Sequence, residues 1–227
     1  MVLETTERRL MPTAPYHCAD GERVPGTTTV IGRFKDSGAL MHWAFQQGKS
    51  GAERLYDAAE KAADIGTLAH AMVEAHIKGE APESVFNGAP EEDCAKATNA
   101  FNEYLEWAAQ TDVKIIAQEM HLVSEEYRFG GTPDAIGLIG NSLCLLDWKT
   151  SNAVYPDYAI QLAAYRQLWN ENHPEQPLTG ASYLLRFSKN YPDFEARKFG
   201  DLSEAWEIFK HYRAAYDLDK QLKARVK

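Results

Sequence analysis

The stretch from Gly130 to Tyr165 constrains the fold of this chain more than any other. It contains two strand-like segments, DAIGLI and SLCLLDWK, which are separated by Gly140-Asn141 and followed by a helical segment. Glycine and asparagine tolerate positive backbone φ angles, so this dipeptide predicts the two-residue loop of a β-hairpin. The order predicted here is therefore a strand, a tight turn, a second strand and a helix.

The predicted loop determines the register of the hairpin, because Ile139 must then pair with Ser142. Counting outward from this pair brings Asp134 directly opposite Asp147. Directly opposed side chains hold their Cβ atoms roughly 4.5–5.5 Å apart, and two like charges so placed destabilise a sheet. A divalent cation between the two carboxylates would offset the repulsion, since Mg²⁺ usually binds through one or two carboxylates.

A lysine shares this face of the sheet. Side chains two residues apart in a strand project to the same side, so Lys149 lies beside Asp147. The side chains predicted to point to the other side are those of Cys144, Leu146 and Trp148. The sequence thus predicts two carboxylates and one ammonium group on one sheet face.

These residues carry a family resemblance. Pro133-Asp134 followed by Asp147-Trp148-Lys149 resembles the signature of the PD-(D/E)XK nuclease superfamily. The segment from Gln161 to Tyr165 on the next helix is similar to the QxxxY element of the RecB-like exonucleases, which include phage, CRISPR-associated and mitochondrial genome-maintenance enzymes. The resemblance spans roughly residues 24–200 and implies an α/β fold with a restriction-endonuclease-like mixed sheet flanked by helices.

The resemblance also implies a metal site. Asp134, Asp147 and His70 would hold one or two Mg²⁺ or Mn²⁺ ions, and Lys149 would position a water and offset charge on the phosphate. His70 matches the family's helical histidine through the segment GTLAH. Considered without the resemblance, His70 and Glu74 form an (i, i+4) pair that could ligate a metal or simply hydrogen-bond on a helix surface.

Three more residues are candidates for the catalytic site. Glu119 lies where the RecB-like pattern often has a glutamate near the metal, and its alternative is a solvent-exposed glutamate at a sheet edge. Gln161 and Tyr165 are one helical turn apart and project together. Gln161 could orient the lysine or a phosphate, and Tyr165 could contact the DNA backbone or stack on a base. For both, the alternative is a polar helix surface.

Composition and charge limit the class of protein. With 227 residues and 44% hydrophobic content, we expect a single nuclease domain over 1–227, with a mainly helical lobe at 1–110 and a catalytic sheet core at 111–227. No apolar run reaches the roughly 18 residues of a membrane span and no signal peptide is apparent, so we expect a cytoplasmic protein of a bacterial or phage-infected cell, with no membrane partner.

The cysteines and the net charge bear on cofactors and partners. No cysteine follows Cys144, whereas the iron–sulfur members of the branch have three near the C-terminus, so we expect no iron–sulfur cluster. The net charge of −9 counts against nucleic-acid binding, but the acidic residues gather in the middle of the chain and the ends are net basic. We therefore expect modest, salt-sensitive affinity for DNA.

Periodicity and turn signals predict the remaining elements. Before the hairpin these are a strand within 24–34, a helix from Ser37 to about Gly48, a helical stretch broken at Asp64-Ile65-Gly66 and restarted by Thr67 up to Gly79, a helix over about 93–110 and one strand over 113–124. After it come a helix capped by Asp157, strands within 182–189 and 194–199, and a helix from about Ser203.

The combined prediction is a metal-dependent DNA exonuclease that acts on single-stranded or end-bearing DNA in recombination, repair or replication. A helicase or recombinase is a candidate partner. We find no separate base-reading module, and we expect the helical segment 37–110 to arch over the catalytic face, with Trp43, Tyr104 or Tyr165 stacking on bases. The alternatives are a catalytically silent DNA-binding or helicase-partner module, and a plain interaction domain.

Overall fold

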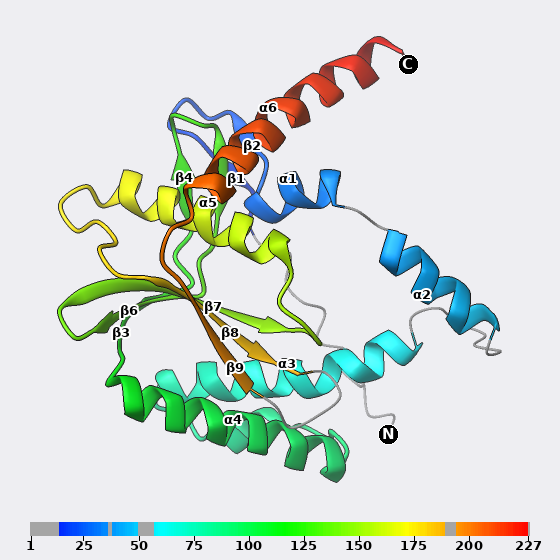
Figure 1. Cartoon of the computed structure of the whole chain (residues 1–227), viewed down its shortest axis with the longest axis vertical. Coiled ribbons are helices and arrows are strands. Elements are labelled where there is room, and N and C mark those ends of the chain that lie inside the picture. Colours follow the sequence, from blue (N-terminus) through cyan, green and yellow to red (C-terminus); the bar gives the residue numbers. More distant parts are fainter. Residues whose placement is uncertain (1–13, 36–37, 50–56, 189–193, 227) are drawn as a thin grey trace, which may run out of the picture.

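A mixed five-stranded sheet forms the centre of the protein in the computed structural model, which describes residues 14–35, 38–49, 57–188 and 194–226 (Figure 1). The order of its strands is β3-β6-β7-β8-β9. Their bounds are β3 Lys114–Gln118, β6 Ala135–Ile139, β7 Ser142–Thr150, β8 Ser182–Phe187 and β9 Phe194–Phe199. All pairings are antiparallel except that of β7 with β8. The predicted α/β class with a mixed sheet is confirmed.

The hairpin of β6 and β7 has the predicted register. Ile139 pairs with Ser142 and Ala135 pairs with Leu146, so the next position outward places Asp134 opposite Asp147. Gly140 has a φ of +59°, in the left-handed region that glycine adopts at little cost. The turn residue therefore sets which side chains share each face of the sheet.

Helices cover both faces of the sheet (Figure 1). One face carries α5 Pro156–Asn172, with α1 Thr27–Phe34 and α6 Ser203–Arg225 packed against it, while the other carries α3 Asp57–Ile77 and α4 Glu91–Thr111. Alternate residues of β7 contribute to two hydrophobic cores, one on each face of the sheet. Leu145 packs on the α5 side, and Leu146 and Trp148 pack on the α3 and α4 side. Asp147 and Lys149 lie two and four residues after Leu145, so their side chains are on the same side of the sheet, the α5 side.

Smaller elements complete the described chain. They are β1 Tyr16–His17, β2 Arg23–Val24, β4 Leu122–Ser124, β5 Phe129–Gly131, helix α2 Gly38–Lys49 and a 3-10 turn, η1 Pro82–Val85. Strands β1 and β2 form a hairpin, as do β4 and β5, apart from the main sheet. No helix in the described part of the chain is long and apolar enough to cross a membrane.

The predicted strand within 24–34 is wrong, because most of this segment is helix α1. The helix starts after Gly26, and Thr27, Val30 and Ile31 are buried on one side of it. These positions have the i, i+3, i+4 spacing of a helix face. β-Branched residues favour strands only weakly, so the burial of this face against α5 and α6 decides the outcome.

The predicted helix break at Asp64-Ile65-Gly66 is also wrong, since α3 is continuous. Gly66 serves a close approach instead: a Cβ atom at this position would lie 1.8 Å from Cγ2 of Thr150 on β7. Gly79, with a φ of +76°, follows the end of the helix as predicted. The glycine within α3 therefore lets the helix lie directly on the sheet.

Two other boundaries differ from the prediction. The strand expected over 113–124 is divided into β3 and β4, with Glu119 at a φ of +48° between them. Helix α5 begins at Pro156 with Tyr155 as its N-cap residue, and Asp157 lies in its first turn without capping it. Asp157 instead forms an ion pair with Lys35, with 3.2 Å between Oδ2 and Nζ.

Candidate active site

Asp134, directly before β6, is held by β7 and by the residue that follows β3. Its Oδ2 atom accepts a hydrogen bond from the backbone N–H of Trp148 at 2.8 Å. Its backbone carbonyl accepts another from the N–H of Glu119 at 3.0 Å. The carboxylate is therefore fixed in place, with its Oδ1 atom still available to a ligand.

Asp147 is the most deeply buried charged group of the site, at 1% exposure. Its Oδ2 atom forms an ion pair with Nζ of Lys149 at 2.5 Å, but neither carboxylate oxygen has a hydrogen bond of good geometry. Burial raises the pKa of this carboxyl to about 6, with the nearby charge of Asp134 adding to the rise and Lys149 opposing it. A buried carboxylate with free lone pairs is suited to bind a cation.

Lys149 lies between this carboxylate and an aromatic ring. Burial opposes its charge, yet the carboxylates of Asp147 and Asp134 raise its pKa, so the side chain stays protonated at neutral pH. Its Nζ atom also lies 5.9 Å from the ring centroid of Tyr158 on α5. Tyr158 was not predicted from the sequence; only its position shortly after the strand that carries Lys149 could have pointed to it.

His70 reaches the site from α3, at the end of the sheet where Asp134 lies. Its Nε2 atom is 3.0 Å from Oε1 of Glu74, and its ring centroid is 6.1 Å from that of Trp148. Burial lowers the pKa of His70, but the hydrogen bond with Glu74 and the charge of Asp134 outweigh it and raise the pKa. His70, Glu74, Glu119 and Asp134 line one small cavity.

The structure thus brings Glu119 to the predicted neighbourhood in an unexpected way. It occupies a left-handed backbone position after β3, not the interior of a strand. A non-glycine residue in this region is strained, and such strain concentrates at functional sites. Glu119 reaches the cavity because the chain turns there from β3 toward β4.

Gln161 and Tyr165 project together from α5 and are both buried, at 8% and 5% exposure. Nε2 of Gln161 donates to the hydroxyl of Tyr165 at 2.9 Å. Burial, and then the charges of Asp147 and Asp134, raise the pKa of Tyr165 well above its usual range. A ring so buried cannot stack on a base, and the same holds for Tyr104 at 2% exposure. The side chain of Trp43 lies outside the described residues.

The donor set agrees with a hard divalent cation. Asp134 and Asp147 offer carboxylate oxygens, which Mg²⁺ and Mn²⁺ prefer. His70 would have to leave Glu74 to join them. Across the residues that the structure describes, no group of three or more His, Cys, Asp or Glu side chains is already arranged to hold a metal ion.

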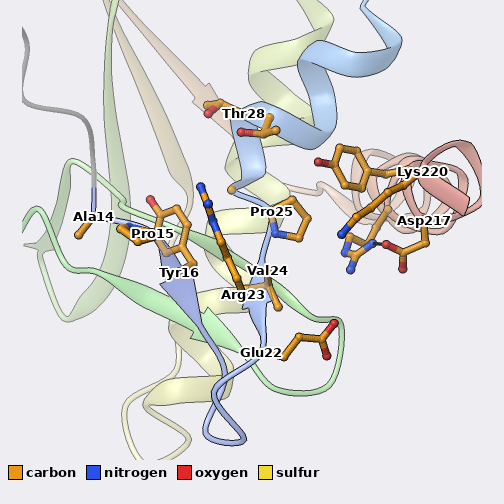
Figure 2. A pocket seen from close by; sticks show the side chains of 14 residues that line it. Ala14, Pro15, Tyr16, Glu22, Arg23, Val24, Pro25, Thr28, Asp217 and Lys220 are labelled. Atoms are coloured by element: carbon orange, nitrogen blue, oxygen red, sulfur yellow. Dashed lines mark ion pairs between the residues drawn. The ribbon is translucent and has the colours of Figure 1, made fainter. Parts of the chain in front are cut away.

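Tyr16 and a polar cavity beside it also escaped the sequence analysis. The Tyr16 hydroxyl lies 3.0 Å from Oγ1 of Thr132, two residues before Asp134, and its ring stacks on His121. The cavity lies between the β1–β2 hairpin, the start of α1 and helix α6, with Arg23 and Lys220 among its lining residues (Figure 2). The polar, turn-rich sequence of residues 1–22 contained no signal for this arrangement.

Comparisons with known proteins assign the chain to a family. The family model for the PD-(D/E)XK nuclease superfamily matches residues 16–221. A comparison with curated proteins found no significant match. Among solved structures, the chain is similar to a putative exonuclease from Eubacterium rectale, at 15% identity and a TM-score of 0.47, over 65% of this chain and 64% of that one. The match thus spans less than two-thirds of that exonuclease.

A second solved structure is an alkaline exonuclease from Laribacter hongkongensis. It is 13% identical, with a TM-score of 0.33, over 56% of this chain and 71% of that one.

Proposed function

Because the chain belongs to the PD-(D/E)XK nuclease superfamily, we propose that it is a metal-dependent deoxyribonuclease that degrades single-stranded or end-bearing DNA. Its reaction is hydrolysis of a phosphodiester bond. The proposed setting is DNA recombination, repair or replication. The QxxxY element formed by Gln161 and Tyr165 supports the RecB-like exonuclease type.

One observation carries the proposal: the hairpin register brings Asp134 opposite Asp147, and the buried Asp147 carboxylate has an ion pair with Lys149 but no hydrogen bond of good geometry. Lys149 offsets part of the repulsion between the two carboxylates, and a bound divalent cation would offset the rest. A structural role alone would be better served by apolar residues at these positions.

Asp134 and Asp147 would hold the cation, with His70 as a third ligand. When bound, the divalent cation supplies Lewis acidity at the phosphate and lowers the pKa of a water. Lys149 would donate hydrogen bonds to that water or to a phosphoryl oxygen and neutralise the charge that develops there. Gln161, bonded to Tyr165, would hold the lysine or a phosphate in position.

The preference for DNA ends is not supported by a helical arch over the catalytic face. The expected arch of the 37–110 segment over the catalytic face does not form from α3 and α4, which cover the opposite face (Figure 1). What supports the preference is the short connection between β7 and α5, residues 151–155, which leaves no room there for a base-reading element.

The test compares linear single-stranded, linear duplex and covalently closed circular DNA in Mg²⁺ or Mn²⁺. Linear single strands should disappear fastest, and EDTA or Asp147→Ala should stop the reaction. Rapid cutting of the closed circle would overturn the end requirement. Binding of DNA without cleavage in any divalent metal would instead support the alternative, a catalytically silent DNA-binding module.

A further inference from the structure

Tyr155 is an exposed aromatic residue at the edge of the candidate active site. It is the N-cap residue of α5, five residues before the buried core position Ile160, and 45% of its surface is exposed. Its extended backbone, with φ −108° and ψ 150°, ends the connection that leaves β7 after Thr150. The chain geometry therefore presents this ring to solvent close to the catalytic lysine.

A continuous set of contacts joins the ring to that lysine. The rings of Tyr155 and Tyr158 meet edge to face, with centroids 5.6 Å apart and an interplanar angle of 76°. The centroid of Tyr158 in turn lies 5.9 Å from Nζ of Lys149. Tyr155 is thus separated from the catalytic ammonium by a single ring.

Lys35, the C-cap residue of α1, adds positive charge on the outer side. Its Nζ atom is 5.9 Å from the centroid of Tyr155, and its side chain is 54% exposed. Its ion pair with Asp157, which is 25% exposed, restrains it there. Lys149 thus lies beside one ring of the Tyr155–Tyr158 pair and Lys35 beside the other. Positive charges so placed suit the phosphates of a nucleic acid, and an exposed ring suits the flat faces of its bases.

We propose that Tyr155 forms a nucleobase-binding site, where the base next to the scissile phosphate stacks while Lys35 faces the adjoining backbone. The inference rests on the proposed nuclease function and supplies the base contact that the buried rings of Tyr104 and Tyr165 cannot make. Stacking on a tyrosine is tolerant of sequence, because every base has an aromatic face. The site therefore suits an enzyme that moves along a strand of any sequence.

The contact can be tested with a pair of matched variants. Tyr155→Phe keeps the ring, and Tyr155→Leu keeps apolar volume without an aromatic face. In EDTA, which prevents cleavage, the Leu variant should bind linear single-stranded DNA at least about fivefold more weakly than the wild type, and the Phe variant should bind like the wild type. Folding of both variants is checked by urea denaturation.

A series of oligonucleotides with one abasic position, moved along the strand, then locates the base. Wild type should lose affinity when the missing base falls at one position, and Tyr155→Leu should lose no further affinity there. Equal affinity of the Phe and Leu variants, with an active wild type, would overturn the base site and leave the proposed function standing. A wild type that cleaves no DNA with any divalent metal would overturn the proposed function itself.

Discussion

Nζ of Lys149 lies 2.5 Å from Oδ2 of Asp147, so the lysine compensates for the buried carboxylate that it accompanies. From the sequence, a metal ion was expected to offset the repulsion between Asp134 and Asp147. In the structure, Lys149 supplies part of that offset. A bound cation would then compete with the lysine for the same carboxylate, which leaves the ammonium free to act on the substrate.

Lys149→Ala and Asp147→Ala should therefore differ. Both should lose cleavage by at least about 100-fold, because each removes a group that acts on the transferring phosphate or its metal. Calorimetric titration with Mn²⁺ should still detect binding to Lys149→Ala but not to Asp147→Ala. Equal loss of metal binding in both variants would mean that the lysine helps to hold the metal.

The buried carboxyl of Asp147 predicts a pH dependence of stability without metal. Its pKa is raised from 3.8 to about 6, so the folded state holds a proton that the unfolded state releases. This group's contribution to stability is complete below about pH 4 and is lost as the pH rises through 6, by on the order of 2–3 kcal/mol.

The measurement is the free energy of unfolding in urea, with EDTA, between pH 4.5 and 8. The difference between Asp147→Asn and the wild type isolates this group, and it should grow in favour of the Asn variant as the pH rises. A difference that stays constant over this range would show that Asp147 does not titrate there. In the wild type, affinity for Mn²⁺ should rise over the same range, since the metal competes with the proton.

His70→Ala tests the third proposed ligand. If His70 joins the two aspartates, the variant should bind Mn²⁺ at least about tenfold more weakly and cleave more slowly. Glu74→Gln is the matched control, because it keeps a hydrogen-bonding partner for the imidazole at 3.0 Å. An unchanged titration in His70→Ala would assign the histidine to its pair with Glu74 alone.

Gly66→Ala should destabilise the fold by about 1–3 kcal/mol, since its Cβ would overlap Thr150, with 1.8 Å to Cγ2. Thr150→Ala should recover part of this loss, so the two changes should be non-additive in urea denaturation. Additive effects would mean that α3 moves away from β7 instead, and with it His70.

The part of the fold that the sequence predicted best is the part controlled by local turn chemistry. The two-residue loop Gly140-Asn141 determines the hairpin register, and the register places Asp134 and Asp147 on one face. The strand-like composition of 24–34 gave a wrong prediction, because the burial of Val30 and Ile31 against helices distant in sequence determines that this segment is a helix. Periodicity within one segment carries no information about such partners.

The contacts around the candidate active site also divide into those set by local sequence and those set by long-range packing. The side of the sheet on which Lys149 lies follows from strand period, but its neighbours Tyr158 and Tyr155 depend on how α5 lies across the strand. Glu119 has its left-handed backbone where the chain leaves β3 toward the separate hairpin of β4 and β5, whose pairing no local pattern specifies. Long-range packing therefore determines what sequence patterns left open.

Because Gln161 and Tyr165 are hydrogen-bonded to each other, variants of this pair can distinguish a structural role from a catalytic one. Tyr165→Phe removes the acceptor of a buried amide and should cost about 1–3 kcal/mol of stability. Tyr165→Phe combined with Gln161→Leu replaces both partners by apolar groups, so it should cost less than the sum of the single changes. If Gln161 acts on the lysine or a phosphate, the double variant should recover stability in urea while kcat remains low. Recovery of kcat together with stability would show that the pair serves packing alone.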